Sequence, residues 1–264
     1  MNISEGIVEE ICFLARADSR VRLLEYLLES SPATQRELRD QLSQSRSTIS
    51  RGVDSLVETG WVRERSDGVE LTPTGRLVIG EFLDLAETMS AAAELSPFLE
   101  RFPLAEFDLT IADLRDSEII VGTDGDPLAP ARTQTDLVRT TPRFRGFFPS
   151  MDLTGTELVH KRTLRGDLEA EIVVSTAVED TIRSDRFASL FSEMLPTGRL
   201  TVHVVDEVPF YLGLGADGRT QIGVEDDDGM PRALLETDTE AVHEWGTELF
   251  ADYCESSTKR LTEL

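Results

Sequence analysis

Short hydroxyl side chains and arginines are concentrated between residues 45 and 51 of this 264-residue chain. The set comprises Ser45, Arg46, Ser47, Thr48, Ser50 and Arg51. Arginine can donate two parallel hydrogen bonds to the edge of a guanine, and serine and threonine can hydrogen-bond to phosphates or base edges. Ile49, Val53 and Leu56 recur at helical spacing in the same stretch, so the polar side chains face outward. We therefore expect a helix whose N-terminal end enters the major groove of DNA.

The elements around this helix are those that would position it. Thr34 and Glu37 form a capping box that starts a shorter helix before it, and Arg36 in that helix is a further candidate DNA contact. Ser43-Gln44 is a tight polar turn between the two helices. Gly60 ends the second helix, because glycine accepts the left-handed conformation that other residues resist.

A β-hairpin is predicted to follow, from residues 61–65 and 69–72 around the turn Ser66-Asp67-Gly68. Arg63 and Arg65 lie on this hairpin, where a wing would touch the DNA backbone or the minor groove. Helix, turn, helix and hairpin is the order of a winged helix-turn-helix. The alternative is a winged helix that binds protein, with a polar face that is simply solvated.

Apolar residues predict two helices before this unit and a long one after it. Segments 7–14 and 18–28 complete a three-helix core, with Asp18-Ser19 as the second helix's cap. Thr72-Pro73 starts the long helix, which runs to about residue 95. Its apolar stripe has coiled-coil spacing over two heptads, so it is either a dimer seam or a face packed on its own domain. The stripe consists of Val78, Phe82, Leu85, Met89 and Ala92.

The rest of the chain mixes strands and helices, with Pro97 and Pro103 at its entrance. Strands are expected at 118–121, 144–148, 170–175, 200–205, 208–214, 220–224 and 232–235, with turns at Asp217-Gly218 and Asp227-Asp228-Gly229. Helices are expected at 128–140, 154–164, 176–194 and from 237 onward. The fold class is therefore α+β, a winged helix-turn-helix domain (1–80), a linker helix (81–105) and an α/β domain with a mixed sheet (106–264).

Several of these segments resemble known regulators. Residues 45–51, 58–62 and 71–75 resemble the winged-helix domains of archaeal and bacterial transcription regulators. Residues 208–214, 241–250 and Tyr253 resemble the effector domain behind the winged helix in archaeal FilR1-type regulators. The resemblance implies transcription regulation with a regulatory second domain, and it carries over no catalytic residue.

Charge is distributed unevenly along the chain, whose formal net charge is −24. Residues 1–80 hold 10 arginines and 13 acidic residues, a net −3, whereas residues 81–264 hold 16 basic and 37 acidic residues, a net −21. Only two of the 26 basic residues are lysines. This acidic, lysine-poor composition resembles that of salt-in halophiles, in which DNA binding gains little from counterion release.

Few residues point to catalysis. The three histidines are scattered, and no pattern typical of a zinc site occurs, so we expect no enzyme, metal or cofactor. Gly122-Thr123-Asp124-Gly125 follows a strand but lacks the Gly-Lys-Ser/Thr ending of a phosphate loop. Arg139, Arg143 and Arg145 lie beside Phe144, Phe147 and Phe148, and they are the candidate site for a small anionic effector. The alternative is that these arginines solvate the rim of an aromatic core.

Cys12 and Cys254 form no disulfide framework, and two reduced thiols are expected. The sequence has no apolar run of membrane-spanning length and no signal-peptide pattern, so we expect a cytoplasmic protein. The expected partners are double-stranded DNA, a second copy of the chain and a small-molecule effector.

Overall fold

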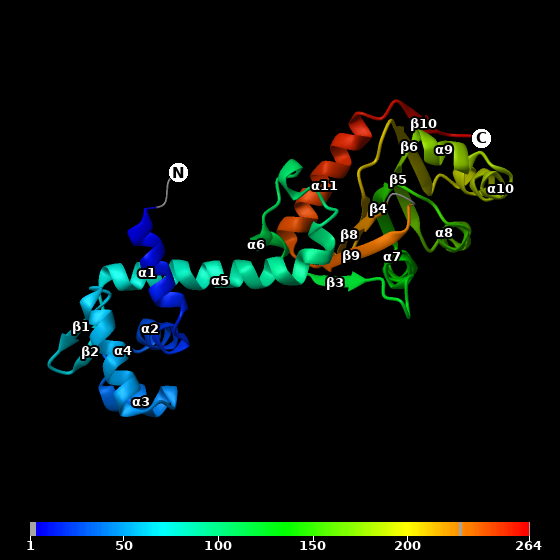
Figure 1. Ribbon diagram of the computed structural model, residues 1–264. Helices are drawn as coiled ribbons and strands as arrows, with labels where there is room; N and C mark the ends of the chain where they lie inside the picture. Colours follow the sequence, from blue (N-terminus) through cyan, green and yellow to red (C-terminus); the bar gives the residue numbers. More distant parts are fainter. Residues whose placement is uncertain (1–3, 227–228, 264) are drawn as a thin grey trace. The chain divides into compact units, whose positions relative to one another are not determined.

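The computed structural model describes residues 4–226 and 229–263, and it divides into two compact units, 1–87 and 88–264 (Figure 1). Helix α5 (Pro73–Leu99) contributes residues to both units. No helix among the described residues is long and apolar enough to cross a membrane.

The first unit has the predicted winged helix-turn-helix order. Its elements are α1 (Glu5–Ala15), α2 (Asp18–Glu29), α3 (Gln35–Leu42), α4 (Arg46–Glu58), β1 (Val62–Arg65), β2 (Gly68–Leu71) and the start of α5. β1 and β2 are antiparallel, with Val62 opposite Leu71, and Ala33 adds an isolated bridge to Val69. The apolar stripes of the helices meet in one core in which Leu24, Leu38 and Leu56 are fully buried.

Capping and turn residues determine where most helices of the first unit begin and end. The predicted capping box at Thr34 and Glu37 is present, and Gly60 has a φ of 74° after the last residue of α4. Ser43 adopts a left-handed φ of 51° in the turn between α3 and α4. The cap of α2 was predicted one residue too late, because Ala17 is the cap residue and Asp18 is already helical.

α5 starts directly on the wing. The backbone N–H of Thr72 donates to the Trp61 carbonyl at 2.9 Å, and the Thr72 hydroxyl donates to the Gly60 carbonyl at 2.7 Å. The N–H of Gly75 donates to the same hydroxyl at 3.0 Å, so Thr72 caps α5 while tying it to the wing. A Cβ at Gly75 would overlap the Trp61 carbonyl oxygen, so this close approach requires glycine.

The second unit contains an eight-stranded mixed sheet in the order β10-β6-β5-β4-β7-β8-β9-β3. Its strands are β3 (Glu118–Val121), β4 (Arg143–Phe148), β5 (Glu169–Ser175), β6 (Leu200–Val205), β7 (Tyr211–Gly215), β8 (Thr220–Glu225), β9 (Pro231–Thr237) and β10 (Lys259–Leu261). Its helices are the end of α5, α6 (Ile111–Leu114), α7 (Ala129–Thr140), α8 (Leu153–Arg165), α9 (Thr176–Ile182), α10 (Asp185–Met194) and α11 (Glu240–Glu255), with short 3-10 turns at Leu104–Glu106 and Leu195–Thr197. The β4-β5 and β5-β6 pairs are parallel, and the other pairs are antiparallel. The predicted mixed sheet is therefore confirmed.

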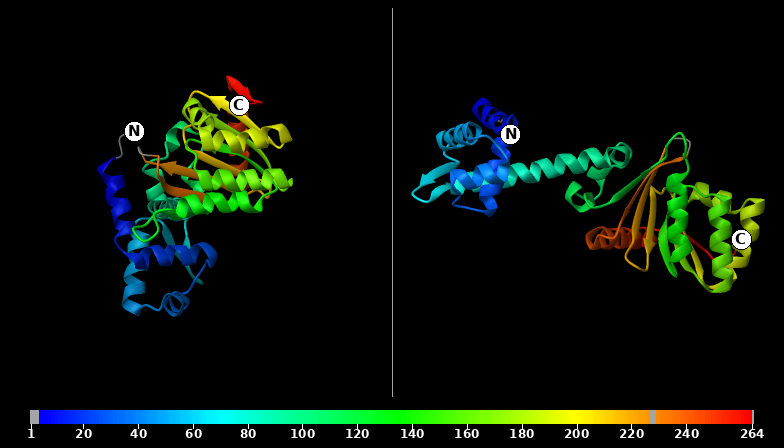
Figure 2. Two further views of the ribbon diagram at one scale, coloured as in Figure 1. Left: turned by 90° about the vertical axis from the view of Figure 1, so that its right-hand side faces the viewer. Right: turned by 90° about the horizontal axis from the view of Figure 1, so that it is seen from below.

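The sheet is the middle of three layers. The right-hand view of Figure 2 shows α11 on one side of the strands and α7 and α8 on the other. Side chains alternate between the two faces along each strand. In β5, Val173 therefore enters the core with α5 and α11, whereas Ile172 and Val174 enter the core with α7, α9 and α10.

Several predicted boundaries in this unit were wrong. The single helix predicted for 176–194 is two helices, because Ser184 adopts an extended conformation (ψ 152°) and its hydroxyl bonds the Thr181 carbonyl. Pro97 does not end α5, which continues to Leu99. β10 was not predicted, and Asp227 and Asp228 of the predicted turn lie outside the described residues.

Gly75→Ala should destabilise the first unit by about 1–3 kcal/mol, because the new methyl group forces α5 away from the wing. Gly80→Ala in the same helix should instead stabilise it by roughly 0.5–1 kcal/mol, because a Cβ there meets nothing within 4 Å. Urea unfolding followed by the fluorescence of Trp61, in a Trp245→Phe background, measures both changes. Equal changes in the free energy of unfolding for the two substitutions would contradict the close approach of α5 to the Trp61 backbone.

Candidate nucleic-acid interface and ligand cavity

The N-terminal end of α4 presents hydroxyl groups that are already ordered. The Ser45 hydroxyl accepts from the Thr48 backbone N–H at 3.2 Å and lies 3.0 Å from the Ser47 hydroxyl oxygen. Ser45, Ser47 and Thr48 are all exposed, while Ser50 is half-buried. The end of this helix therefore combines free backbone amides, which favour phosphate, with small hydrogen-bonding side chains.

Arg46 and Arg51 are exposed on the same helix, as the sequence predicted. Among the described residues, neither forms an ion pair with an acidic side chain. Both guanidinium groups are thus free to donate to an incoming polyanion.

The other three predicted DNA contacts are paired with carboxylates. Arg63 and Arg65 on β1 share Glu70 of β2, with Nε–Oε1 distances of 2.5 and 3.7 Å. Arg36 on α3 lies 3.7 Å from Asp40. All three arginines remain exposed, so the positive charge of the wing and of α3 is partly neutralised but accessible.

The predicted effector arginines also have acidic partners. Arg143 Nε lies 3.3 Å from Glu169, Arg145 Nε lies 3.5 Å from Glu171, and Arg139 pairs with Asp136. Arg143 and Arg145 alternate with Phe144 along β4, so they leave the sheet on the opposite face. They line a shallow depression with Arg199, whereas Phe144 and Phe148 line a deeper cavity without these arginines.

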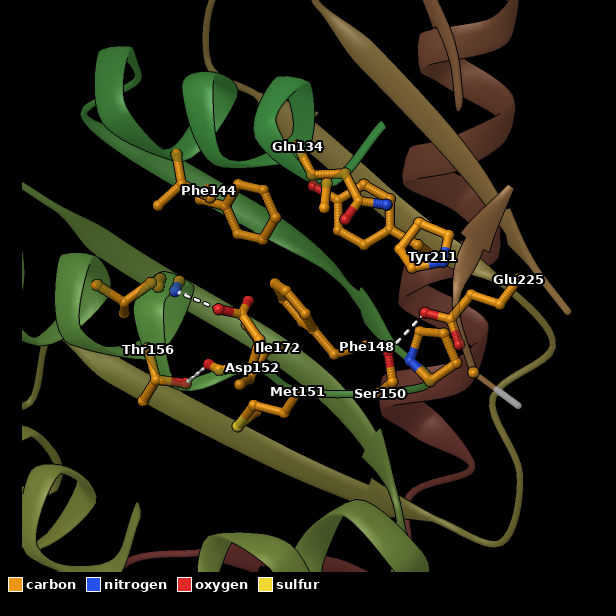
Figure 3. Close-up of a pocket in the computed structure, with 18 of the residues that line it drawn as sticks. Gln134, Phe144, Phe148, Ser150, Met151, Asp152, Thr156, Ile172, Tyr211 and Glu225 are labelled. Atoms are coloured by element: carbon orange, nitrogen blue, oxygen red, sulfur yellow. Dashed lines mark hydrogen bonds between the residues drawn. The ribbon is translucent and has the colours of Figure 1, made fainter. Parts of the chain in front are cut away.

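This deeper cavity, of about 350 Å³, lies between the sheet and α7, α8 and α10 (Figure 3). Its wall is mostly apolar, from side chains that are far apart in the sequence. They include Leu128, Val138, Phe144, Phe148, Met151, Val159, Leu168, Ile172, Phe191, Met194, Leu200, Met230 and Pro231. A volume in the range of small-molecule pockets with such a lining suits an apolar ligand.

Polar groups are few, and two of them, Ser150 and Glu225, form a pair at one end of the cavity, which we call its polar end. Figure 3 shows the carboxylate of Glu225 and the hydroxyl of Ser150 turned toward each other, and Ser150 Oγ donates to Glu225 Oε1 at 2.5 Å. Burial raises the pKa of the Glu225 carboxyl, while the bond from Ser150 opposes that rise. Asp152 is the cap residue of α8, where its Oδ1 accepts from the Gly155 N–H at 2.9 Å.

Tyr211 closes another side of the cavity as part of a buried polar chain. Its hydroxyl donates to Gln221 Oε1 at 3.3 Å, and Gln221 Nε2 donates to Glu236 at 2.5 Å. Burial, together with the charge of Glu236, raises the pKa of Tyr211. Gly213 makes room for the ring, since a Cβ there would lie 2.6 Å from the Tyr211 hydroxyl.

The opposite face of the sheet brings together side chains that the sequence did not associate. The potential ligand atoms of Glu171, His203 and Cys254 all lie within 4.8 Å of one another. Burial, and next the charge of Glu171, raises the pKa of the Cys254 thiol to about 12. The adjacent Arg145 pairs with Glu171 and disfavours a divalent cation, and His203 is hydrogen-bonded to Glu171 and Ser257, so the cluster is better explained as a hydrogen-bonded core edge. The sequence could not reveal the cluster, because Glu171, His203 and Cys254 lie on β5, β6 and α11 and share no spacing motif.

The comparisons with known proteins agree with this architecture. Residues 8–94 match the model of the HVO_A0261 N-terminal domain, and residues 127–256 match that of the middle domain of the methanogenesis regulatory protein FilR1. A family model thus matches each half of the chain. The match over residues 127–256 supports the predicted resemblance to the archaeal FilR1-type regulators. No curated protein matches the chain in sequence.

Solved structures show weaker likenesses. The archaeal chromatin protein TrmBL2 is 12% identical, with 95% of this chain and 99% of that chain covered and a TM-score of 0.44. The phospholipase D family member Nuc from Salmonella typhimurium is 11% identical, with 54% and 97% covered and a TM-score of 0.41. NucT from Helicobacter pylori is 10% identical, with 54% and 97% covered and a TM-score of 0.43. These values are too low to transfer any feature to this chain.

The raised pKa of Cys254 predicts slow thiol chemistry. In a Cys12→Ser variant, the folded protein should react with Ellman's reagent at pH 8 roughly a thousandfold more slowly than the urea-unfolded chain, because the free thiol has a pKa near ~8.5. Glu171→Gln should speed the reaction of the folded protein, since it removes a negative charge beside the sulfur. Reaction rates of the folded and unfolded chains within tenfold of each other would show that Cys254 is not so protected.

Proposed function

We propose that this protein is a sequence-specific transcription regulator that reads double-stranded DNA through α4 and its wing. The observation that carries the proposal is the N-terminal end of α4, where Arg46 and Arg51 are exposed without acidic partners beside ordered hydroxyl groups. In this role Arg46 and Arg51 contact base edges, and the serine and threonine hydroxyls contact bases or phosphates. The match of residues 127–256 to the middle domain of a regulatory protein supports this role and gives no support to an enzymatic one.

The wing and α3 contribute contacts to the DNA backbone in this proposal. Arg63 and Arg65 would give up their ion pairs with Glu70 and bind DNA phosphates or the minor groove instead. Arg36 would likewise leave Asp40 and bind a phosphate. A net charge of −24 with only two lysines supports a halophilic cytoplasm as the setting. In concentrated salt, counterion release gives little driving force, so direct and water-mediated hydrogen bonds must supply more of the affinity.

We also propose that the protein acts as a homodimer, since two recognition helices can then meet successive turns of the groove. The structure divides the predicted stripe on α5 into two parts. Val78 and Phe82 pack on the core of the first unit, whereas Leu85 and Met89 are 50% and 65% exposed. Leu85 and Met89 are therefore the part of the stripe that a second copy can cover.

The second domain is proposed to sense a small molecule. Its 350 Å³ cavity supports this role, and α5 is one continuous helix that contributes residues to both units. A ligand shifts DNA affinity only if it binds the two states of the protein differently. The anionic effector at Arg139, Arg143 and Arg145 stays a prediction, but each of these arginines already has a carboxylate partner.

The second candidate function is a winged helix that contacts another protein. The carboxylate partners of Arg36, Arg63 and Arg65 favour it, since they weaken the field that would attract DNA. Selection of bound sequences from a random DNA pool in molar KCl separates the two functions. Enrichment of one motif supports DNA reading, and a pool that stays random supports the protein-binding alternative.

On the selected sequence, Arg46→Ala and Arg51→Ala should each weaken binding by about 1–3 kcal/mol, because a bidentate contact to a base is lost. Fluorescence anisotropy with labelled DNA gives the change. Arg76→Ala is the matched control, an exposed arginine on α5 outside the proposed interface. If both variants bind like the parent while their folds are intact, α4 is not the recognition helix.

Light scattering in molar KCl should give twice the 29.3 kDa mass of one chain. Leu85→Glu and Met89→Glu should each return the mass to that of one chain, because a carboxylate would be buried without a partner. Leu77→Glu should leave the dimer intact, since Leu77 is 65% exposed on α5 but lies off the stripe. A parent protein that scatters as a monomer would rule out this assembly.

A further inference from the structure

The chemical character of the cavity in the second domain follows from its wall. The cavity lies on the face of the sheet covered by α7, α8 and α10, and its polar end follows the carboxyl end of the parallel strand β4. In open α/β sheets, ligands bind preferentially outside the carboxyl ends of the strands. The position of the cavity is therefore one at which a ligand is expected.

The charges at this cavity are all of one sign. Asp152 and Glu225 are its two acidic lining residues, and no lysine, arginine or histidine is among the described residues that line it. An anion entering this cavity would lose hydration in an apolar wall and meet two carboxylates without a compensating cation. The cavity therefore selects against anionic compounds.

Hydrogen bonding at the polar end sets a further requirement. Glu225 Oε1 accepts from Ser150, and this carboxylate is half-buried at the edge of the apolar wall. A carboxylate only accepts hydrogen bonds when it is ionised, so it is best satisfied by a ligand that donates one. Gln134 lies at the same wall near Tyr211, held close to the sheet because Gly223 has no Cβ, which would lie 2.7 Å from Gln134 Nε2.

We propose that this cavity binds an apolar compound of two or three rings that is neutral or cationic and donates a hydrogen bond to Glu225. The inference rests on the proposed sensing function of the second domain. The ligand it proposes differs from the anionic effector predicted at Arg139, Arg143 and Arg145 both in charge and in binding site. Phe144, Phe148 and Met151 hold the rings of the compound, and Ser150 orients the carboxylate that receives its N–H or O–H group.

Two fluorescent probes with the same ring skeleton test the charge preference. N-phenyl-1-naphthylamine is neutral, apolar and carries one N–H donor, and 8-anilino-1-naphthalenesulfonate adds a sulfonate to it. Titration of the full-length protein should show the neutral probe binding at one site per chain, at least tenfold more tightly than the sulfonate. Equal affinities, or tighter binding of the sulfonate, would overturn the proposal, as would the absence of binding by the neutral probe.

Variants locate the binding site. Ala131→Trp on α7 and Met151→Trp after β4 each fill the cavity and should weaken the binding of the neutral probe at least tenfold. Ala177→Trp is the control, because Ala177 is exposed on α9 away from the cavity, and it should leave this binding unchanged. Glu225→Gln should reduce the ratio of the affinities of the two probes at least threefold, because it removes the negative charge that repels the sulfonate. Circular dichroism identifies any variant that does not fold. Unchanged binding by both folded cavity-filling variants would place the probe elsewhere and overturn the proposal.

The outcome is independent of DNA binding, because the titrations use the protein without DNA. A protein that binds the neutral probe as described but selects no DNA motif would disprove the regulatory function and leave the cavity assignment standing. A protein that selects a DNA motif but does not bind the probe would disprove the cavity assignment alone.

Discussion

The attachment of α5 to the wing is the contact on which the arrangement of the first unit depends. Thr72 bonds two consecutive carbonyls at the start of the wing and also caps α5, and Gly75 lets the helix lie against the same backbone. The bond from the Thr72 N–H to the Trp61 carbonyl and the close approach of Gly75 involve main-chain atoms only, and the short Thr72 side chain adds two further bonds, so the start of the helix is well fixed. From this anchored first turn, α5 continues without interruption to Leu99.

The sequence predicted the first unit well because its signals are local. A capping box, a glycine after α4 and a turn before β2 each act within a few residues, and all three are present. The order of the eight strands could not be predicted in this way. It depends on contacts between segments far apart in the chain, such as the pairing of β4 with both β5 and β7 and that of β3 with β9.

The same distinction explains what could be predicted of the sites. Arg46 and Arg51 lie outside the apolar stripe of Ile49, Val53 and Leu56, so spacing alone showed that they point outward. Arg143 and Arg145 are as close to Phe144 in sequence as residues can be, yet alternation along a strand puts them on the other side of the sheet. The cavity draws its wall from segments between Leu128 and Pro231, and Glu225 and Ser150 meet across 75 residues. No pattern within a short window could have associated these two side chains.

The shared partner of Arg63 and Arg65 has a consequence for how such a protein would search a chromosome. A phosphate that approaches the wing would compete with Glu70 for these arginines, so each non-cognate stretch of DNA would gain less from them than from unpaired arginines. If α4 reads DNA as proposed, its contacts on a cognate site would hold the wing close to the backbone and favour the replacement of Glu70 by phosphate. In that case the carboxylate would shorten the dwell time on non-cognate sequences more than on the cognate one, and fewer copies of the protein would be bound to competing DNA.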